Sequence, residues 1–143
     1  MRTFNSGYKS VCLFGRGTIY NSDDNVRDPM RLYICRKSMY PTLSDDLVVT
    51  GHHGILVDTL TNEQLIMTKK LVNTIYTTEG KYRLFAWIDD RAVPYEKRGY
   101  YTVFHIALEN EDYYANYGVY ANGLLVETAG KRWLNELNYM ELI

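Results

Sequence analysis

The stretch Asp46-Leu47-Val48-Val49-Thr50-Gly51-His52-His53-Gly54-Ile55-Leu56-Val57 decides the fold class of this 143-residue chain. A four-residue apolar run ends at a glycine, two adjacent histidines follow, and a second glycine opens another apolar run. Short apolar runs bounded by glycine are typical of β-strands. The stretch therefore predicts two short strands joined by a tight turn that carries both histidines.

The rest of the chain repeats this pattern of short strands. Runs with strand character cover residues 8–14, 18–20, 31–36, 74–78, 82–87, 100–108 and 117–128. We expect Gly15-Arg16-Gly17 to close the first of these runs, and Asn122-Gly123 is the strongest turn signal within the last. So many closely spaced strands predict an all-β fold, either a sandwich, a barrel or a twisted β-roll.

Two helices are expected in addition to the strands. Thr61 followed by Gln64 has the spacing of a helix N-terminus, and apolar residues continue to Val72. The second helix is indicated by apolar residues at three- and four-residue spacing between Trp133 and Met140, which predicts a C-terminal helical extension over residues 129–143. Because we find no repeat, linker or low-complexity segment, residues 1–143 are expected to form a single domain.

Composition and charge narrow the classes of partner. The formal net charge of −1 gives no electrostatic reason to expect nucleic acid or an anionic membrane. The sequence has no apolar run of about 20 residues that would span a bilayer, and no signal peptide, so we expect an intracellular protein. Cys12 and Cys35 lack CxxC partners and are expected to be buried thiols.

The segment from Thr50 to His53 is the main candidate for chemistry. An imidazole can be neutral or charged near pH 7, so it suits proton transfer to a leaving group, and the Thr50 hydroxyl could hold a carbonyl or orient the ring. The alternative is a pair of turn histidines bonded to the backbone. No metal is expected, because adjacent strand residues point to opposite faces. No cofactor is expected either.

The remaining histidine, His105, lies in a predicted strand over residues 102–108. By period-two alternation it shares a face with Val103 and Ala107, while Phe104 lies on the other face. Both faces are apolar, which predicts burial on both sides. His105 is then either a core histidine with satisfied ring nitrogens or a residue that faces the same cavity as His53. Two carboxylate pairs, Asp45-Asp46 and Asp89-Asp90, flank turns and are expected to be solvated.

Three stretches, in this order, resemble the Hint (hedgehog/intein) self-processing family, especially its versions in large DNA viruses. The opening stretch carries the Thr-x-x-His pattern at Thr50 and His53, residues 101–110 resemble the penultimate strand block, and residues 117–128 resemble the closing block. The resemblance implies a horseshoe-like all-β fold. It also implies protein self-cleavage or splicing, in which a Cys or Ser attacks the preceding carbonyl in an N-to-S acyl shift.

The same resemblance implies roles for the site residues. His53 would be the general acid that protonates the departing amide nitrogen, Thr50 would be the orienting hydroxyl, and His105 stands where many inteins place Asp. Where inteins end the closing block with His-Asn, this chain has Glu127 and Thr128, which cannot perform the asparagine cyclisation.

The N-terminal residues depart from the full family pattern. Residues 2–11 resemble a segment that normally follows the nucleophile block, so we expect an N-terminally incomplete module. Cys12 is a poor substitute, since Thr18 falls one residue late and a strand interior disfavours a thiolate. We expect no activity from this chain alone, and its partner would be its own flanking polypeptide or a missing N-terminal segment. Two alternatives stay open: a non-catalytic protein-binding or scaffold domain that keeps the fold, and the C-terminal part of a split module.

Overall fold

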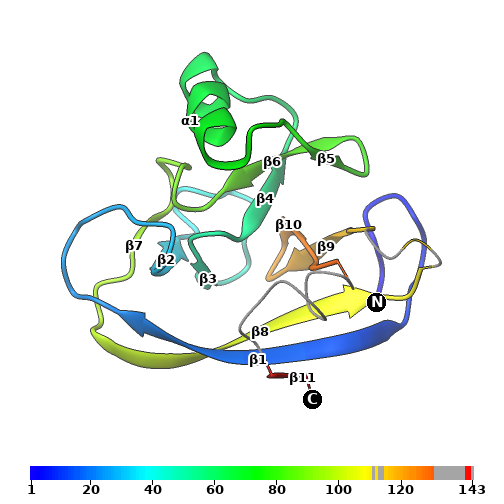
Figure 1. Ribbon diagram of the computed structural model, residues 1–143, viewed down its shortest axis with the longest axis horizontal. Helices are drawn as coiled ribbons and strands as arrows, with labels where there is room; N and C mark the ends of the chain where they lie inside the picture. Colours follow the sequence, from blue (N-terminus) through cyan, green and yellow to red (C-terminus); the bar gives the residue numbers. More distant parts are fainter. Residues whose placement is uncertain (111, 113–114, 131–140, 143) are drawn as a thin grey trace.

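The computed structural model describes residues 1–110, 112, 115–130 and 141–142, and most of the regular structure in them is β-sheet (Figure 1). The strands are β1 (Val11–Asn21), β2 (Leu32–Cys35), β3 (Leu47–Thr50), β4 (Gly54–Val57), β5 (Thr77–Thr78), β6 (Lys81–Phe85), β7 (Val93–Pro94), β8 (Gly99–Leu108), β9 (Gly118–Ala121), β10 (Leu124–Glu127) and β11 (Glu141–Leu142), and α1 spans Asn62–Val72. The all-β class expected from the sequence is confirmed.

The two longest strands, β1 and β8, pair antiparallel along their whole length and form the ribbon at the lower edge of Figure 1. The expectation that Gly15-Arg16-Gly17 ends the first strand is wrong, because β1 runs through these residues to Asn21. Gly15 pairs with His105 and Gly17 pairs with Val103, so the glycines lie inside the ladder opposite larger side chains. Glycine is found within strands where a neighbouring group approaches closely.

The β1–β8 ribbon has one inward and one outward face. Side chains alternate along both strands, and the outward face exposes two aromatic pairs. Tyr20 and Tyr100 have ring centroids 5.1 Å apart, and Phe14 and Phe104 have centroids 5.3 Å apart. Phe104 is 52% exposed, so the prediction that this strand is buried on both faces is wrong. The rings contact each other across the strands, tilted in one pair and edge-on in the other, and remain exposed.

Apart from β11, which pairs with β1, the remaining strands form two further antiparallel sheets. One has the order β5-β6-β4-β10-β9 and the other the order β3-β2-β7. The main core draws buried side chains from both sheets, from the end of β8 and from the connecting loops; these include Tyr33, Cys35, Tyr40, Leu43, Val49, Ile55, Leu108, Tyr117, Val119, Leu124 and Val126. All four residues of β2 are buried, so this strand is covered on both faces.

Helix α1 begins where the sequence predicts. Thr61 is its N-cap, and its side chain and that of Gln64 form a reciprocal capping box. Asn73 ends the helix in the left-handed conformation. Most of the second predicted helix, residues 131–140, lies outside the described residues, and Glu141–Leu142 form β11 beside β1 instead of continuing a helix. No helix in the described part of the chain has the length and apolar character needed to cross a bilayer.

The turn between β9 and β10 is the predicted Asn122-Gly123 hairpin. Both residues have positive φ, 48° and 89°, as a two-residue turn of type I′ requires. Gly123 is also confined by its surroundings, because a Cβ built there would lie 2.3 Å from the carbonyl oxygen of Thr42. The hairpin is thereby fixed against the loop that precedes β3.

We predict that Gly123→Ala destabilises the fold more than Gly80→Ala. Gly80 has a comparable φ of 81° but open space around its Cβ position, so alanine there suffers only the left-handed strain of about 1–2 kcal/mol. At Gly123 a clash of about 1–3 kcal/mol is added. Urea unfolding of both variants measures the difference, and equal losses would contradict the close approach to Thr42.

Candidate functional site

The turn that carries the histidines is fixed by its backbone. The N–H of His53 donates to the carbonyl of Thr50 at 3.0 Å, which closes the turn between β3 and β4. The carbonyl of His53 accepts from the N–H of Ala86 at 3.0 Å, and the carbonyl of Gly51 accepts from Trp87 at 3.1 Å. The segment that follows β6 therefore holds the turn from one side.

Glycine is required at position 51 by a close approach from the other side. The N–H of Gly51 donates to the carbonyl of Arg31 at 2.8 Å, and a Cβ on Gly51 would lie 2.5 Å from the carbonyl oxygen of Pro29. The turn is thus pressed against residues 29–31. The position of Thr50 and His53 depends on how this neighbouring segment is held.

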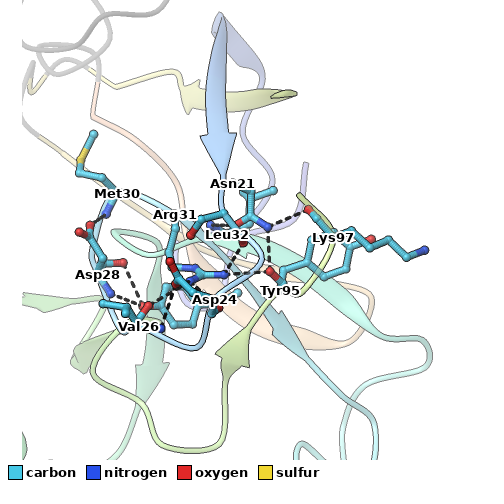
Figure 2. A network of polar contacts seen from close by, with 11 residues as sticks. Asn21, Asp24, Val26, Asp28, Met30, Arg31, Leu32, Tyr95 and Lys97 are labelled. Carbon is cyan, nitrogen blue, oxygen red and sulfur yellow. Dashed lines mark hydrogen bonds and ion pairs between the residues drawn. The ribbon is translucent and has the colours of Figure 1, made fainter. Parts of the chain in front are cut away.

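A buried guanidinium holds that segment (Figure 2). The Arg31 side chain is 4% exposed and pairs with Asp24 at 2.7 Å, and its Nη atoms also donate to four backbone carbonyls. Two of these carbonyls belong to Ser22 and to Tyr95, which lies on the chain leading into β8. A hydrogen bond from the N–H of Val26 lowers the pKa of Asp24 most, and Ser22 and the Arg31 guanidinium lower it further. Arg31 therefore joins the loop after β1, the start of β2 and the approach to β8.

Asn21 completes this junction at the end of β1. Its Nδ2 donates to the carbonyls of Tyr95 and Lys97, and its Oδ1 accepts from the N–H of Leu32 (Figure 2). Sequence reasoning did not single out Asn21 or Arg31. The sequence shows only that Arg31 stands directly before an apolar run. This position does not distinguish a buried arginine from a surface arginine.

The three residues that the sequence nominates lie on one cavity of about 500 Å³ between β3 and β8. Thr50 and His53 reach it from the β3–β4 turn, and His105 reaches it from the inward face of β8. The rest of the wall is mainly apolar: Leu32, Leu47, Val48, Val49, Tyr95, Tyr101, Thr102, Val103, Phe104, Ala121 and Val126. His105 lines the cavity of His53, which is one of the two placements that periodicity left open for it.

His53 and His105 lie face to face. Their ring centroids are 5.6 Å apart and the planes are inclined by 20°. Burial, together with the adjacent His105, lowers the pKa of His53 to about 3. Burial also lowers the pKa of His105. The His53 imidazole is therefore neutral at pH 7 and becomes charged only well below that pH.

Two polar atoms on this cavity are buried without a hydrogen-bond partner among the described residues. They are Oγ1 of Thr50 and Nε2 of His53, and the other such side-chain atoms are Nε of Arg31 and Nε1 of Trp87. Buried polar atoms are normally satisfied, so each exception calls for an explanation. The ring of His53 does not fit a turn histidine bonded to the backbone. Its Nε2 and the Thr50 hydroxyl are free to bond a group that enters the cavity.

His52 differs from its neighbour. It is exposed, and its ring packs edge-on against Phe85 with centroids 6.4 Å apart. It is not among the residues that line the cavity of His53. The two adjacent histidines of this turn thus have separate surroundings.

Neither cysteine belongs to the cavity wall. The prediction of a buried thiol is confirmed for Cys35, whose pKa burial raises to about 11, and is wrong for Cys12, which is exposed. Cys12 lies where the β1–β8 register shifts, on the outward face of the ribbon, and its Sγ donates to the carbonyl of Ala107 at 3.4 Å. The described cavity wall contains no thiol.

The last two residues of the closing stretch have structural contacts. Glu127 pairs with Arg83 and accepts from the hydroxyl of Thr78 at 2.9 Å, and burial raises the pKa of Glu127. Thr128 is buried, and its Oγ1 accepts from the N–H of Tyr117 at 3.0 Å. Neither residue lines the cavity of His53.

The prediction that both carboxylate pairs are solvated is wrong for one residue, Asp89. Asp89 is buried, where it pairs with Arg91 at 2.8 Å and accepts from the hydroxyl of Tyr40 at 2.8 Å. Its neighbour Asp90 is exposed, as are Asp45 and Asp46. Asp89 is buried because it has a cationic and a hydroxyl partner, which the sequence pattern does not reveal.

No family model, no curated protein and no solved structure matches the chain. Within the described residues, no three His, Cys, Asp or Glu side chains lie close enough together to hold a metal ion. What this site can do chemically therefore follows from the arrangement of Thr50, His53 and His105.

We predict that His53→Gln weakens the dependence of stability on acid pH. The folded pKa of about 3 lies below the ordinary value of 6.5, so the unfolded chain binds the proton first and stability falls as the pH drops from 6.5 toward 3. The loss reaches about 1.4 kcal/mol per pH unit. Urea unfolding between pH 7 and acid pH measures it. Burial also lowers the pKa of His52, but less than that of His53, so His52→Gln should keep most of the slope. An unchanged slope in His53→Gln would contradict the neutral His53 imidazole.

Proposed function

We propose that this chain is a Hint-type autoprocessing domain in which Thr50, His53 and His105 form the proton-transfer part of a site for peptide-bond rearrangement. The observation that carries the proposal is the pair of unpartnered buried atoms, Oγ1 of Thr50 and Nε2 of His53, on one cavity beside the stacked ring of His105. The order of the three resembling stretches and the all-β fold support it.

His53 would act first as a base. Its imidazole is neutral at pH 7 and so has a ring nitrogen able to accept the proton of an attacking thiol or hydroxyl. Because a pKa of about 3 makes this a weak base, the proton moves as the sulfur or oxygen bonds to the preceding carbonyl carbon. The carbon–nitrogen bond then breaks, and the imidazolium returns its proton to the departing nitrogen. The general-acid role implied by the family resemblance is the second half of this sequence.

Thr50 and His105 would be positioning residues. The unpartnered Thr50 hydroxyl can donate to the carbonyl oxygen of the reacting peptide group and so stabilise negative charge that develops there. The ring of His105, stacked at 5.6 Å, limits rotation of the His53 ring and keeps its Nε2 directed to the same place. This proposal requires no cofactor or metal.

The attacking group would come from another polypeptide segment. In the described wall of the cavity the aliphatic hydroxyls are those of Thr50 and Thr102, and no thiol is present. The partner is accordingly a peptide segment that presents a Cys or Ser, either from a flanking region or from a separate chain. An alternative function, a protein-binding domain without catalysis, is favoured by the mainly apolar lining of the same cavity.

A synthetic peptide with a Cys between apolar residues tests this function when mixed with the chain and dithiothreitol. We predict cleavage before the Cys, seen by mass spectrometry as a thiol adduct of the N-terminal fragment. His53→Ala should lower the rate by about 100-fold or more, the size of a general acid–base contribution. His52→Ala serves as the matched control and should keep the rate.

The same assay without peptide measures the chain alone, for which we predict no thiol-dependent cleavage. Thiol-dependent cleavage at Cys12 would contradict the assignment of the nucleophile to another segment. Equal rates in the His53→Ala and His52→Ala variants would remove His53 from the mechanism.

A further inference from the structure

Among the described residues, no strand pairs with the edge of β8 that faces away from β1, which lies beside the cavity. The carbonyl of Ile106 accepts from the N–H of Ala129 on that far side. In an antiparallel ladder the backbone groups of alternate residues point to the same edge, so those of Phe104 and Thr102 also point away from β1. Within the described chain, β8 pairs with β1 alone, and these backbone groups have no strand beside them.

The edge of β3 that faces away from β2 likewise has no paired strand in the part of the chain that the structure describes. The hydrogen bond from Gly51 to Arg31 continues the β2–β3 ladder, and alternation then directs the backbone groups of Thr50 and Val48 to the opposite edge. The carbonyl of Thr50 indeed turns away from β2 to accept from His53. In the described sheets β3 is a terminal strand, so the N–H and C=O of Val48 also lack a neighbour.

Both open edges border the cavity of His53. Its wall includes consecutive residues of each strand, 47–50 of β3 and 101–105 of β8. The side chains of consecutive strand residues point to opposite faces. A cavity that consecutive residues line therefore lies along the edge of the strand. Natural proteins usually protect such edges with charged residues or proline. Neither of these two segments contains a charged residue or a proline.

We propose that the cavity between β3 and β8 is a slot that binds an extended peptide by strand addition, with backbone hydrogen bonds to Val48 and Thr102 and apolar side chains on the cavity wall. This deepens the proposed function, on which it rests for the identity of the occupant: the segment that carries the scissile bond enters as a strand. Residues 101–105 span roughly 16 Å, enough for a peptide of about five residues.

The polar end of the slot fits a peptide group better than an apolar small molecule. Nε2 of His53 and Oγ1 of Thr50 are buried and unpartnered within the described structure. A strand that hydrogen-bonds along β3 brings its own carbonyls and N–H groups to this end, where they can satisfy both atoms. An apolar ligand would leave both atoms unsatisfied.

The probe is an acetylated and amidated peptide, Lys-Val-Gln-Val-Gln-Val-Lys, which contains no thiol or hydroxyl. Its matched control has the same sequence with N-methyl groups on alternate backbone nitrogens. At millimolar concentration the unmodified peptide should slow amide hydrogen exchange at Thr102, Phe104 and Val48 by about tenfold. The N-methylated peptide should leave these rates unchanged.

Two variants of the chain locate the binding. Thr102→Pro removes an N–H that the β1 ladder does not use, so it should abolish binding while keeping the fold. Tyr120→Pro makes the same change at the open edge of β9 and should bind normally. Equal binding of both peptides, or slowed amide exchange at Tyr120 in place of Thr102, would contradict strand addition between β3 and β8. Strand binding without cleavage of the Cys peptide would keep the slot and reject the catalytic function.

Discussion

The antiparallel pairing of β1 with β8 is the constraint on which the site depends. The ladder extends along both strands and fixes which side chains of β8 face inward. His105 is one of these, and its ring reaches the ring of His53 from a sheet to which His53 does not belong. A shift of one residue in this register would turn the side chain of His105 outward and that of Phe104 inward.

A second constraint holds the opposite wall. His53 lies in a turn that Arg31 and Pro29 support from one side and Ala86 and Trp87 from the other. Arg31 is itself buried among backbone carbonyls, including that of Tyr95 on the chain entering β8. One guanidinium thus ties the segment behind the histidine turn to the beginning of the strand that carries His105. Because the two walls are joined at this end, the gap between β3 and β8 has a defined width.

Much of this arrangement could be predicted from the sequence. Apolar runs bounded by glycine located β3 and β4, the capping pattern located α1, and Asn122-Gly123 located the β9–β10 hairpin. The exposed outer face of β8 could not be predicted. An apolar strand residue has the same sequence pattern whether a covering layer buries it or only a ring of the neighbouring strand contacts it. The buried Asp89 and Arg31 were missed for a related reason: a charge is buried only where distant segments supply partners, and local spacing does not report them.

The central claim, that two sheets bring His53 and His105 together on one cavity, is tested most directly by proton NMR of the imidazole rings. With the ring centroids 5.6 Å apart, nuclear Overhauser effects should connect the ring protons of His53 to those of His105, and none should connect His52 to His105. Absence of the first contact in a folded chain, or its replacement by a contact between His52 and His105, would contradict the account.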